Sequence, residues 1–301
     1  MRLAITGGTG FVGSHLLGVA LAEGHRVKAL TRRDQPPRDG LEWISGDLSD
    51  RDALHRLVDR ADAIIHVAGT ITGATAAVFE KGNVTGTLAM LAAATAGGVH
   101  RFVHVSSLAA REPNLSLYGG SKARAEELVH SSGLDWAIVR PPAVYGPGDK
   151  ETLELFRMAK LGLMLMPPKG RVSVIHADDL ARLLLALAAP AVPSNILIEA
   201  DDAKPGGWTH REFARALAAA VGTKAAVISS PGIVLRLAAR VDQLWRGEKA
   251  KLTTDRAAYF SHRNWVVEPK RACPPQIWQP RIETMQGLRD TAEWYRAEGW
   301  L

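Results

Sequence analysis

Tyr118 and Lys122 are a phenol and an ammonium four positions apart, a pair with direct chemical use. A separation of four places both side chains on one face of a helix, within reach of each other. A free phenol loses its proton near pH ~10, and a neighbouring ammonium favours the phenolate. The spacing therefore predicts a lowered tyrosine pKa and a general acid or base that works near neutrality.

A glycine-rich segment, Thr6-Gly-Gly-Thr-Gly-Phe-Val-Gly13, follows the first apolar run of the chain. Gly7, Gly10 and Gly13 have the spacing of a dinucleotide-binding loop, in which glycine permits a tight turn and a close approach of the backbone to a pyrophosphate. The helix predicted to begin here would offer its free amides to the same anion. The segment therefore predicts a site for a dinucleotide.

The choice between NAD and NADP depends on residues about twenty positions further along, at the end of the second strand. That strand ends in Leu30-Thr31-Arg32-Arg33. Two guanidinium groups and no acid favour the 2′-phosphate of NADP. Asp34 stands next to them, so NAD remains an alternative.

Short apolar runs alternate with amphipathic segments through the first 190 residues. This alternation predicts a doubly wound, parallel Rossmann sheet of the α/β class with helices on both faces. The expected strands are Leu3–Thr6, Arg26–Leu30, Leu41–Ser45, Ala63–Val67, Phe102–Ser106 and Trp136–Val139, and the expected helices lie near 11–23, 50–60, 75–97 and 119–132.

The remainder of the chain predicts a smaller, mostly helical C-terminal lobe. A helix near 150–163, a strand near 171–175 and a helix from about Asp179 complete the first domain, and Asp179 is expected to cap that helix. We expect a dinucleotide-binding domain over 1–190 and a substrate-binding lobe over 191–301. The lobe has helical periodicity at 209–221, 231–246 and 284–297, with a strand at 224–229.

The composition of the chain indicates where the protein is expected to be in the cell and which kinds of partner it is expected to bind. Cys273 is the single cysteine, and no stretch approaches the roughly 20 apolar residues of a membrane span. We therefore expect a cytoplasmic protein. Residues 1–200 carry 21 Lys/Arg against 20 Asp/Glu, whereas 201–301 carry 16 against 11. The basic segment 231–271 contains Trp245 and Trp265, a composition that suits a solvated face over an ordinary core. The same composition also suits a peripheral membrane contact, an acidic partner or nucleic acid.

These motifs, in this order, resemble the short-chain dehydrogenase/reductase superfamily in its extended or atypical branch, over about residues 1–190. The resemblance also rests on further segments of the sequence: Gly46-Asp47-Leu48, His66-Val67-Ala68-Gly69, Asn83-Val84-x-Gly86-Thr87, Val105-Ser106-Ser107, Arg140-Pro141 and Val144-Tyr145-Gly146-Pro147. It implies catalytic roles for Ser107, Tyr118 and Lys122, with Ser106 as the competing serine. It implies coenzyme contacts by Gly7, Gly10, Phe11, Val12, Gly13, Arg32, Arg33, Asp47, Leu48, Val67, Ala68, Gly69, Tyr118, Lys122 and Pro141.

Other polar residues carry less specific signals. The resemblance implies that Asn83 supports the active-site helix, and a turn asparagine is the alternative. His100 and His104 share a predicted strand without a third ligand, so we expect structural histidines and no metal site.

Two departures from the family pattern bear on the substrate. Ser107 is followed by Leu-Ala-Ala-Arg111 instead of Val-Tyr-Gly, and Ala143 stands where sugar-nucleotide enzymes commonly have asparagine. Both favour the group of flavonoid-ketone reductases and hydroxysteroid dehydrogenases. The apolar run Leu161–Pro168 could line an apolar pocket or belong to the core.

We therefore expect an NAD(P)-dependent oxidoreductase that interconverts a carbonyl and an alcohol on a small or lipophilic substrate. One alternative is an NAD-dependent sugar-nucleotide epimerase or dehydratase. Another is a non-catalytic nucleotide-binding subunit of a membrane-associated complex. Expected partners are a small-molecule substrate and a second copy in a homodimer, and no nucleic acid.

Overall fold

The computed structural model describes residues 1–230, 237, 245 and 254–301. The helix predicted over 231–246, apart from Leu237 and Trp245, lies outside the described residues, as does the first half of the basic segment 231–271. The chain divides into two compact units. The first comprises Met1–Pro141, Asp178–Glu199 and Arg271–Gln279, and the second comprises Pro142–Ala177, Ala200–Lys270 and Pro280–Leu301. The units interleave along the chain, whereas the sequence predicted a division near residue 190.

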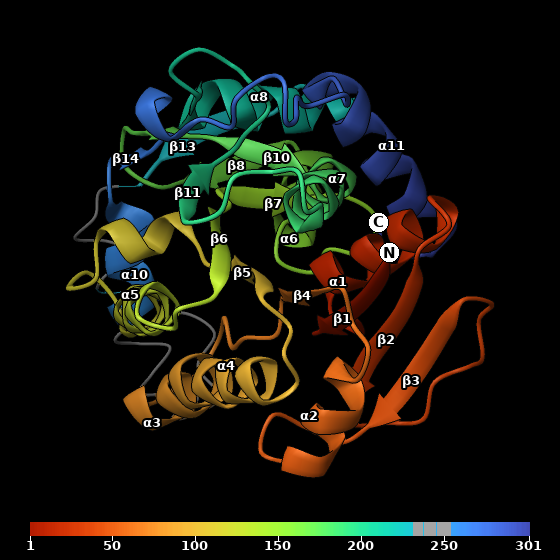
Figure 1. Cartoon of the computed structure of the whole chain (residues 1–301). Coiled ribbons are helices and arrows are strands. Elements are labelled where there is room, and N and C mark those ends of the chain that lie inside the picture. Colours follow the sequence, from red (N-terminus) through yellow and green to blue (C-terminus); the bar gives the residue numbers. More distant parts are fainter. Residues whose placement is uncertain (231–236, 238–244, 246–253) are drawn as a thin grey trace. The chain divides into compact units, whose positions relative to one another are not determined.

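The first unit is built on a seven-stranded sheet in which every pair of neighbouring strands is parallel. The strand order is β11-β6-β5-β4-β1-β2-β3, and the row can be followed in Figure 1. The bounds are β1 Arg2–Thr6, β2 Arg26–Thr31, β3 Leu41–Ser45, β4 Ala63–His66, β5 Arg101–Val105, β6 Asp135–Arg140 and β11 Ile196–Glu199. This order confirms the predicted doubly wound α/β sheet.

Helices cover both faces of this sheet, which explains why its central strands are buried throughout. Figure 1 shows α2, α4 and α5 on one face and α1 and α7 on the other. The bounds are α1 Phe11–Ala22, α2 Arg51–Val58, α3 Ala76–Phe79, α4 Gly86–Ala96, α5 Leu117–His130 and α7 Ala177–Ala188. The single helix predicted over 75–97 is interrupted by a π-helical segment, Glu80–Thr85.

Asp179 lies in the first turn of α7 and does not cap it. Its carboxylate is 2.6 Å from the Arg182 guanidinium, one turn further along the same helix. The predicted position of Asp179 at the N-cap is therefore wrong, because the helix begins two residues earlier, at Ala177.

The second unit combines helices with three small sheets. β7 (Ala143–Tyr145) pairs with β10 (Val174–His176), β8 (Leu163–Met166) pairs with β13 (Ala226–Ser229), and β9 (Arg171–Val172) lies between β12 (Trp208–Thr209) and β14 (Asn264–Trp265). Its helices are α6 Leu153–Lys160, α8 His210–Val221, α10 Thr254–Ser261 and α11 Thr284–Ala297. Its core is centred on Tyr145, Phe156, Leu217, Leu288 and Tyr295. No helix among the described residues is long and apolar enough to cross a membrane.

Candidate active site

The residues predicted to hold the coenzyme gather at the carboxyl ends of the strands of the first unit. Gly7–Gly13 follows β1, Arg32 and Arg33 follow β2, and Asp47 and Leu48 lie just beyond β3. Val67, Ala68 and Gly69 follow β4, and Pro141 follows β6. Because the strands are parallel, these segments share one edge of the sheet, which is where open α/β sheets bind ligands.

The glycine-rich loop has no room for side chains. Gly7 adopts a φ of 75°, and a Cβ there would lie 2.7 Å from the backbone nitrogen of Ala68. A Cβ on Gly13 would lie 2.0 Å from the carbonyl oxygen of Gly7. Gly10 caps α1 without a side-chain hydrogen bond, which leaves the first amides of the helix available to an anion. This geometry fits the pyrophosphate of a nicotinamide dinucleotide.

Buried polar side chains fix the segment that follows β4. The imidazole Nδ1 of His66 is 2.7 Å from the hydroxyl of Thr6, and the same hydroxyl accepts a hydrogen bond from the backbone nitrogen of Ala68 at 3.2 Å. Burial lowers the pKa of His66 to about 3, so the imidazole is neutral and can share a hydrogen with Thr6.

His104 stacks on His66, with ring centroids 5.6 Å apart. Neither ring nitrogen of His104 has a hydrogen-bond partner among the residues that the structure describes, and burial lowers the pKa of His104 well below the usual range. No cluster of three metal-ligating side chains occurs among the described residues.

Ser107, Tyr118 and Lys122 come together beyond the end of β5. Ser107 lies two residues beyond this strand, and its side chain comes close enough to the phenol of Tyr118, in the first turn of α5, to lower the pKa of that phenol. Lys122 lies one turn further on α5, and its Nζ donates to the carbonyl oxygen of Val105 at 2.6 Å. Nζ is also 3.6 Å from the position that a Cβ on Gly69 would take. The predicted catalytic residues thus share the sheet edge with the glycine-rich loop.

The pKa of Tyr118 differs in direction from the prediction. Burial raises it, and the hydrogen bond with Ser107 lowers it by less. The predicted lowering by Lys122 is wrong, because the ammonium is directed at the carbonyl of Val105. Burial also lowers the pKa of Lys122 to about 8, against the opposing effect of Glu126.

The two adjacent serines have different partners. Ser106 donates a short hydrogen bond to the carboxylate of Glu126 on α5. Ser107 instead accepts a hydrogen bond from the backbone nitrogen of Ala109 at 3.2 Å, and its hydroxyl lies near the phenol of Tyr118. The geometry therefore favours Ser107 over Ser106 as the residue that holds a reacting oxygen.

Asn83 braces the active-site helix from the π-helical segment. Its Nδ2 donates to the hydroxyl of Ser121 at 2.8 Å, and that hydroxyl donates to the carbonyl of Tyr118 at 2.7 Å. Its Oδ1 accepts from the backbone nitrogen of Thr70 at 2.6 Å. These contacts match the supporting role implied by the resemblance and do not match a turn asparagine. The π-helical geometry is typical of functional sites.

A buried ion network that the sequence did not reveal lies behind the catalytic residues. Glu126 accepts from Nε and Nη2 of Arg140 at 2.8 and 2.5 Å. Glu199, at the end of β11, lies 3.6 Å from Arg140 and 3.3 Å from Arg111. The only sequence signal was the position of Glu126 four residues after Lys122, which also suits an exposed helix face.

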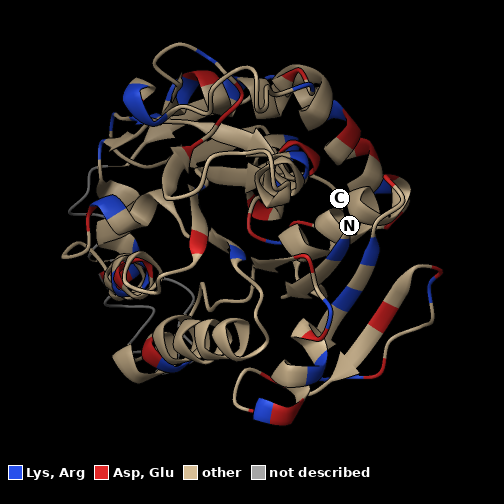
Figure 2. Cartoon of the chain, in the orientation of Figure 1, with Lys and Arg blue, Asp and Glu red and all other residues tan. Residues whose placement is uncertain are grey.

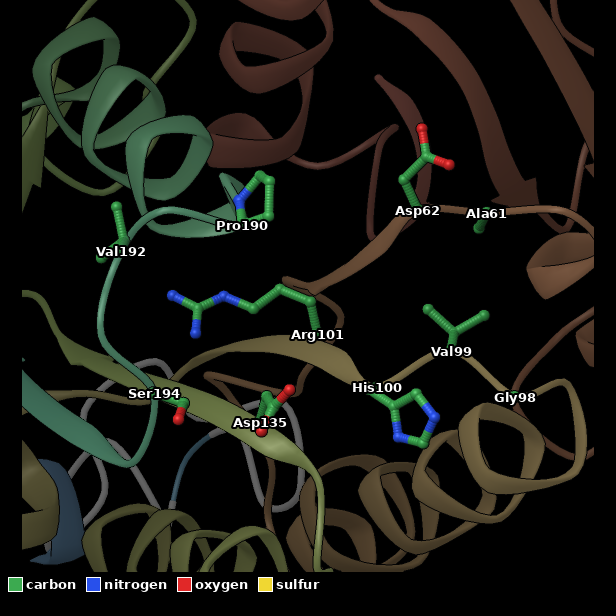
Figure 3. Close-up of a pocket in the computed structure, with 10 residues that line it drawn as sticks. All are labelled: Ala61, Asp62, Gly98, Val99, His100, Arg101, Asp135, Pro190, Val192 and Ser194. Carbon is green, nitrogen blue, oxygen red and sulfur yellow. The ribbon is translucent and has the colours of Figure 1, made fainter.

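A cavity of about 300 Å³ lies at the opposite edge of the same sheet, where β4, β5 and β6 begin (Figure 3). Arg101 extends across it, and its Nε donates to the carbonyl of Leu187 at 2.7 Å. Asp62, also in its wall, is paired with Arg2 at 2.8 Å. The principal polar groups of this cavity are therefore engaged within the protein, and none of the predicted catalytic residues lines it.

Comparison with known proteins agrees with this geometry. Residues 3–197 match the model of the NAD dependent epimerase/dehydratase family. A ceramide reductase from Caulobacter vibrioides is 37% identical over 99% of this chain and 96% of its own length. A 4-hydroxy-2-methyl-3-oxo-4-farnesyl-3,4-dihydroquinoline-1-oxide ketoreductase from Stigmatella aurantiaca is 30% identical, over 96% of this chain and 95% of its own.

Among solved structures, MoeE5 in complex with UDP-glucuronic acid and NAD has a similar fold. The TM-score is 0.73 at 21% identity, with 99% of each chain covered. The resemblance to the short-chain dehydrogenase/reductase superfamily is confirmed, and so is the prediction of an enzyme. The chain belongs to the NAD-dependent epimerase/dehydratase family of enzymes.

Proposed function

We propose that this enzyme is an NADP-dependent oxidoreductase that interconverts a ketone and a secondary alcohol on a lipophilic substrate. The observation that carries the proposal is the approach of the Ser107 hydroxyl to the phenol of Tyr118, at the sheet edge that also carries the glycine-rich loop. The similarity over nearly full length to a ceramide reductase and to a ketoreductase of a farnesylated substrate supports the substrate class. Ceramide and its corresponding ketone are the first pair to assay.

Each catalytic side chain has a distinct role in the proposed reaction. The dinucleotide, when bound, supplies or accepts the hydride. Ser107 donates a hydrogen bond to the substrate oxygen, and Tyr118 gives that oxygen its proton during ketone reduction. The ammonium of Lys122, which the carbonyl of Val105 holds close to Gly69, would bind the dinucleotide and not the phenol oxygen. In the oxidation direction the same proton returns to Tyr118.

The preference for NADP is supported by the residues beyond β2. Arg32 and Arg33 are exposed, and no acidic residue stands between Arg26 and Arg33. Guanidinium groups suit a 2′-phosphate in charge and geometry. Replacing both with alanine should weaken binding of NADPH at least tenfold while changing that of NADH by less than threefold, as measured by fluorescence titration. Equal losses for the two coenzymes would contradict the preference.

The proposal is tested with purified enzyme, NADPH and a panel of ketones that includes the ketone of ceramide. Tyr118→Phe should lower kcat by about 10³-fold and leave the affinity for NADPH nearly unchanged. Retained turnover in this variant would overturn the assignment of Tyr118. Copurified NAD together with turnover of a UDP- or GDP-sugar would instead establish the epimerase or dehydratase alternative.

A purely structural, nucleotide-binding subunit would show no turnover of any carbonyl substrate and would copurify with a stable membrane complex. The presence of Ser107, Tyr118 and Lys122 at one edge of the sheet argues against it, since a scaffold has no need of all three.

A further inference from the structure

The two-stranded sheet of β8 and β13 in the second unit has apolar side chains on both faces. Met164 and Met166 point into the core, where Val227 packs beside them. The alternate positions form the outer face, which we define as Leu163, Leu165, Ala226 and Ile228. The two strands run parallel, and parallel strands are normally covered on both faces, so an exposed apolar face on this pair is unusual.

The outer face is exposed, and the turn before it extends the apolar surface. Leu163, Leu165 and Ile228 are 44%, 53% and 51% exposed, and Leu161 is 84% exposed. The turn is held beside β13 by a hydrogen bond from the backbone nitrogen of Ala226 to the carbonyl of Gly162, at 2.9 Å. Four large aliphatic side chains therefore meet solvent on one small surface. The apolar run Leu161–Pro168 is thus divided between core and surface.

Three exposed lysines lie close to the two strands in sequence, and acids are absent from these stretches of the sequence. Lys160 precedes Leu161, Lys169 follows β8, and Lys224 lies just before β13, with its carbonyl 3.8 Å from the position of a Cβ on Gly162. No acidic residue occurs from Leu155 to Ala177 or from Phe213 to Ser230. Within the described part of the chain, none of the three lysines takes part in an ion pair. Figure 2 shows both strands without charge.

We propose that this face docks on an anionic phospholipid bilayer. Aliphatic side chains inserted at the headgroup boundary and lysines among anionic headgroups are the two contributions that hold peripheral proteins on such surfaces. Two four-residue strands cover roughly 13 Å by 10 Å, far less than the roughly 800 Å² per partner of a stable protein dimer. Docking on a bilayer requires no minimum buried area, so a bilayer fits this face better than a second copy of the chain does.

Vesicle sedimentation of the full-length, coenzyme-free protein tests this docking, and the proposed reaction plays no part in the readout. Wild-type protein should bind vesicles of phosphatidylcholine and phosphatidylglycerol at least tenfold more tightly than vesicles of phosphatidylcholine alone. The pair Leu161→Ser with Leu165→Ser should lower binding to the anionic vesicles at least tenfold, and the pair Lys160→Gln with Lys224→Gln should do the same. Leu88→Ser, which changes a comparably exposed leucine on α4, should bind like wild type.

Circular dichroism of each variant shows that it is folded, as expected for substitutions of exposed side chains. Unchanged vesicle binding by the leucine pair would overturn the proposal, and so would equal binding to the two kinds of vesicle. Native mass spectrometry adds a further criterion. The wild type could form an oligomer that the leucine-pair variant does not form, and bind no vesicles. That result would assign the face to contact between copies of the chain and would overturn the proposal of bilayer docking.

Discussion

The carboxylate of Glu126 accepts two hydrogen bonds from the guanidinium of Arg140, from Nε to Oε1 at 2.8 Å and from Nη2 to Oε2 at 2.5 Å. This pair joins α5, which carries Tyr118 and Lys122, to the end of β6. Glu126 also accepts the hydroxyl of Ser106, so the helix is tied to the loop that ends in Ser107. Through these contacts Glu126 holds the helix that carries Tyr118 and Lys122 next to the loop that carries Ser107.

Removal of the Glu126 carboxylate should destabilise the protein. Glu126→Ala leaves the guanidinium of Arg140 buried, with Glu199 at 3.6 Å, and breaking a buried pair typically costs about 3 kcal/mol or more. Urea unfolding should show this loss. Glu127→Ala changes the exposed neighbour on the same helix and should cost less than ~0.5 kcal/mol. Equal stability of the two variants would show that the ion pair contributes nothing.

The two adjacent serines should differ in their effect on catalysis. Ser107→Ala removes the hydroxyl near the Tyr118 phenol, which is the proposed donor for the substrate oxygen, so kcat/KM should fall by about 10²-fold. Ser106→Ala removes only the bond to Glu126 and should stay within about tenfold of wild type. Steady-state kinetics on the reducible ketone gives both values. The reverse order of effects would assign the catalytic hydroxyl to Ser106.

Two glycines of α1 provide a matched pair of substitutions that tests whether close packing of the glycine-rich loop is needed for coenzyme binding. A Cβ on Gly13 would lie 2.0 Å from the Gly7 carbonyl oxygen, whereas a Cβ on Gly18 meets nothing within 4 Å. Gly13→Ala should therefore displace the loop and lower affinity for the dinucleotide at least tenfold. Gly18→Ala should keep that affinity and stabilise the helix by about 0.5–1 kcal/mol. Isothermal titration and thermal unfolding measure the two effects, and full coenzyme affinity in Gly13→Ala would refute the packing argument.

The regular periodicity of the first 190 residues made most of the fold predictable. The strand Leu41–Ser45 was predicted with its observed bounds, and the helices near 11–23 and 119–132 begin and end within two residues of α1 and α5. The strand β11 was missed because Ile196–Glu199 is short, follows Pro193, and owes its place to pairing with β6 about sixty residues earlier. Such pairing leaves no local pattern.

Site residues that belong to short sequence motifs could be predicted. Contacts between residues that are distant in sequence could not. The glycine spacing and the Tyr118–Lys122 spacing are local, so both were read from the sequence. The network of Glu126, Arg140 and Glu199 joins a helix to two strand ends, and its members look like ordinary surface charges in sequence. The pKa of Tyr118 was mispredicted for the same reason, since its burial depends on tertiary packing.

The buried ammonium of Lys122 should make stability depend on pH. Burial lowers its pKa from 10.5 to about 8 in the folded state, and that difference corresponds to on the order of 3 kcal/mol. Between pH 8 and 10.5 the unfolded chain binds the proton that the folded protein has released, so stability should rise with pH in this window. Below pH 8 both states are charged, and the dependence on Lys122 disappears.

Two variants isolate this dependence from the other titrating groups. Lys122→Met has no charge in either state, and Lys122→Arg stays charged in both. Urea unfolding across the alkaline range should show wild type gaining stability relative to each variant as pH rises through about 8. The difference between wild type and each variant cancels the contribution of every group they share. Parallel stability curves for the three proteins would mean that Lys122 keeps its ordinary pKa in the folded state, and the ammonium would then be as well hydrated as one at the surface.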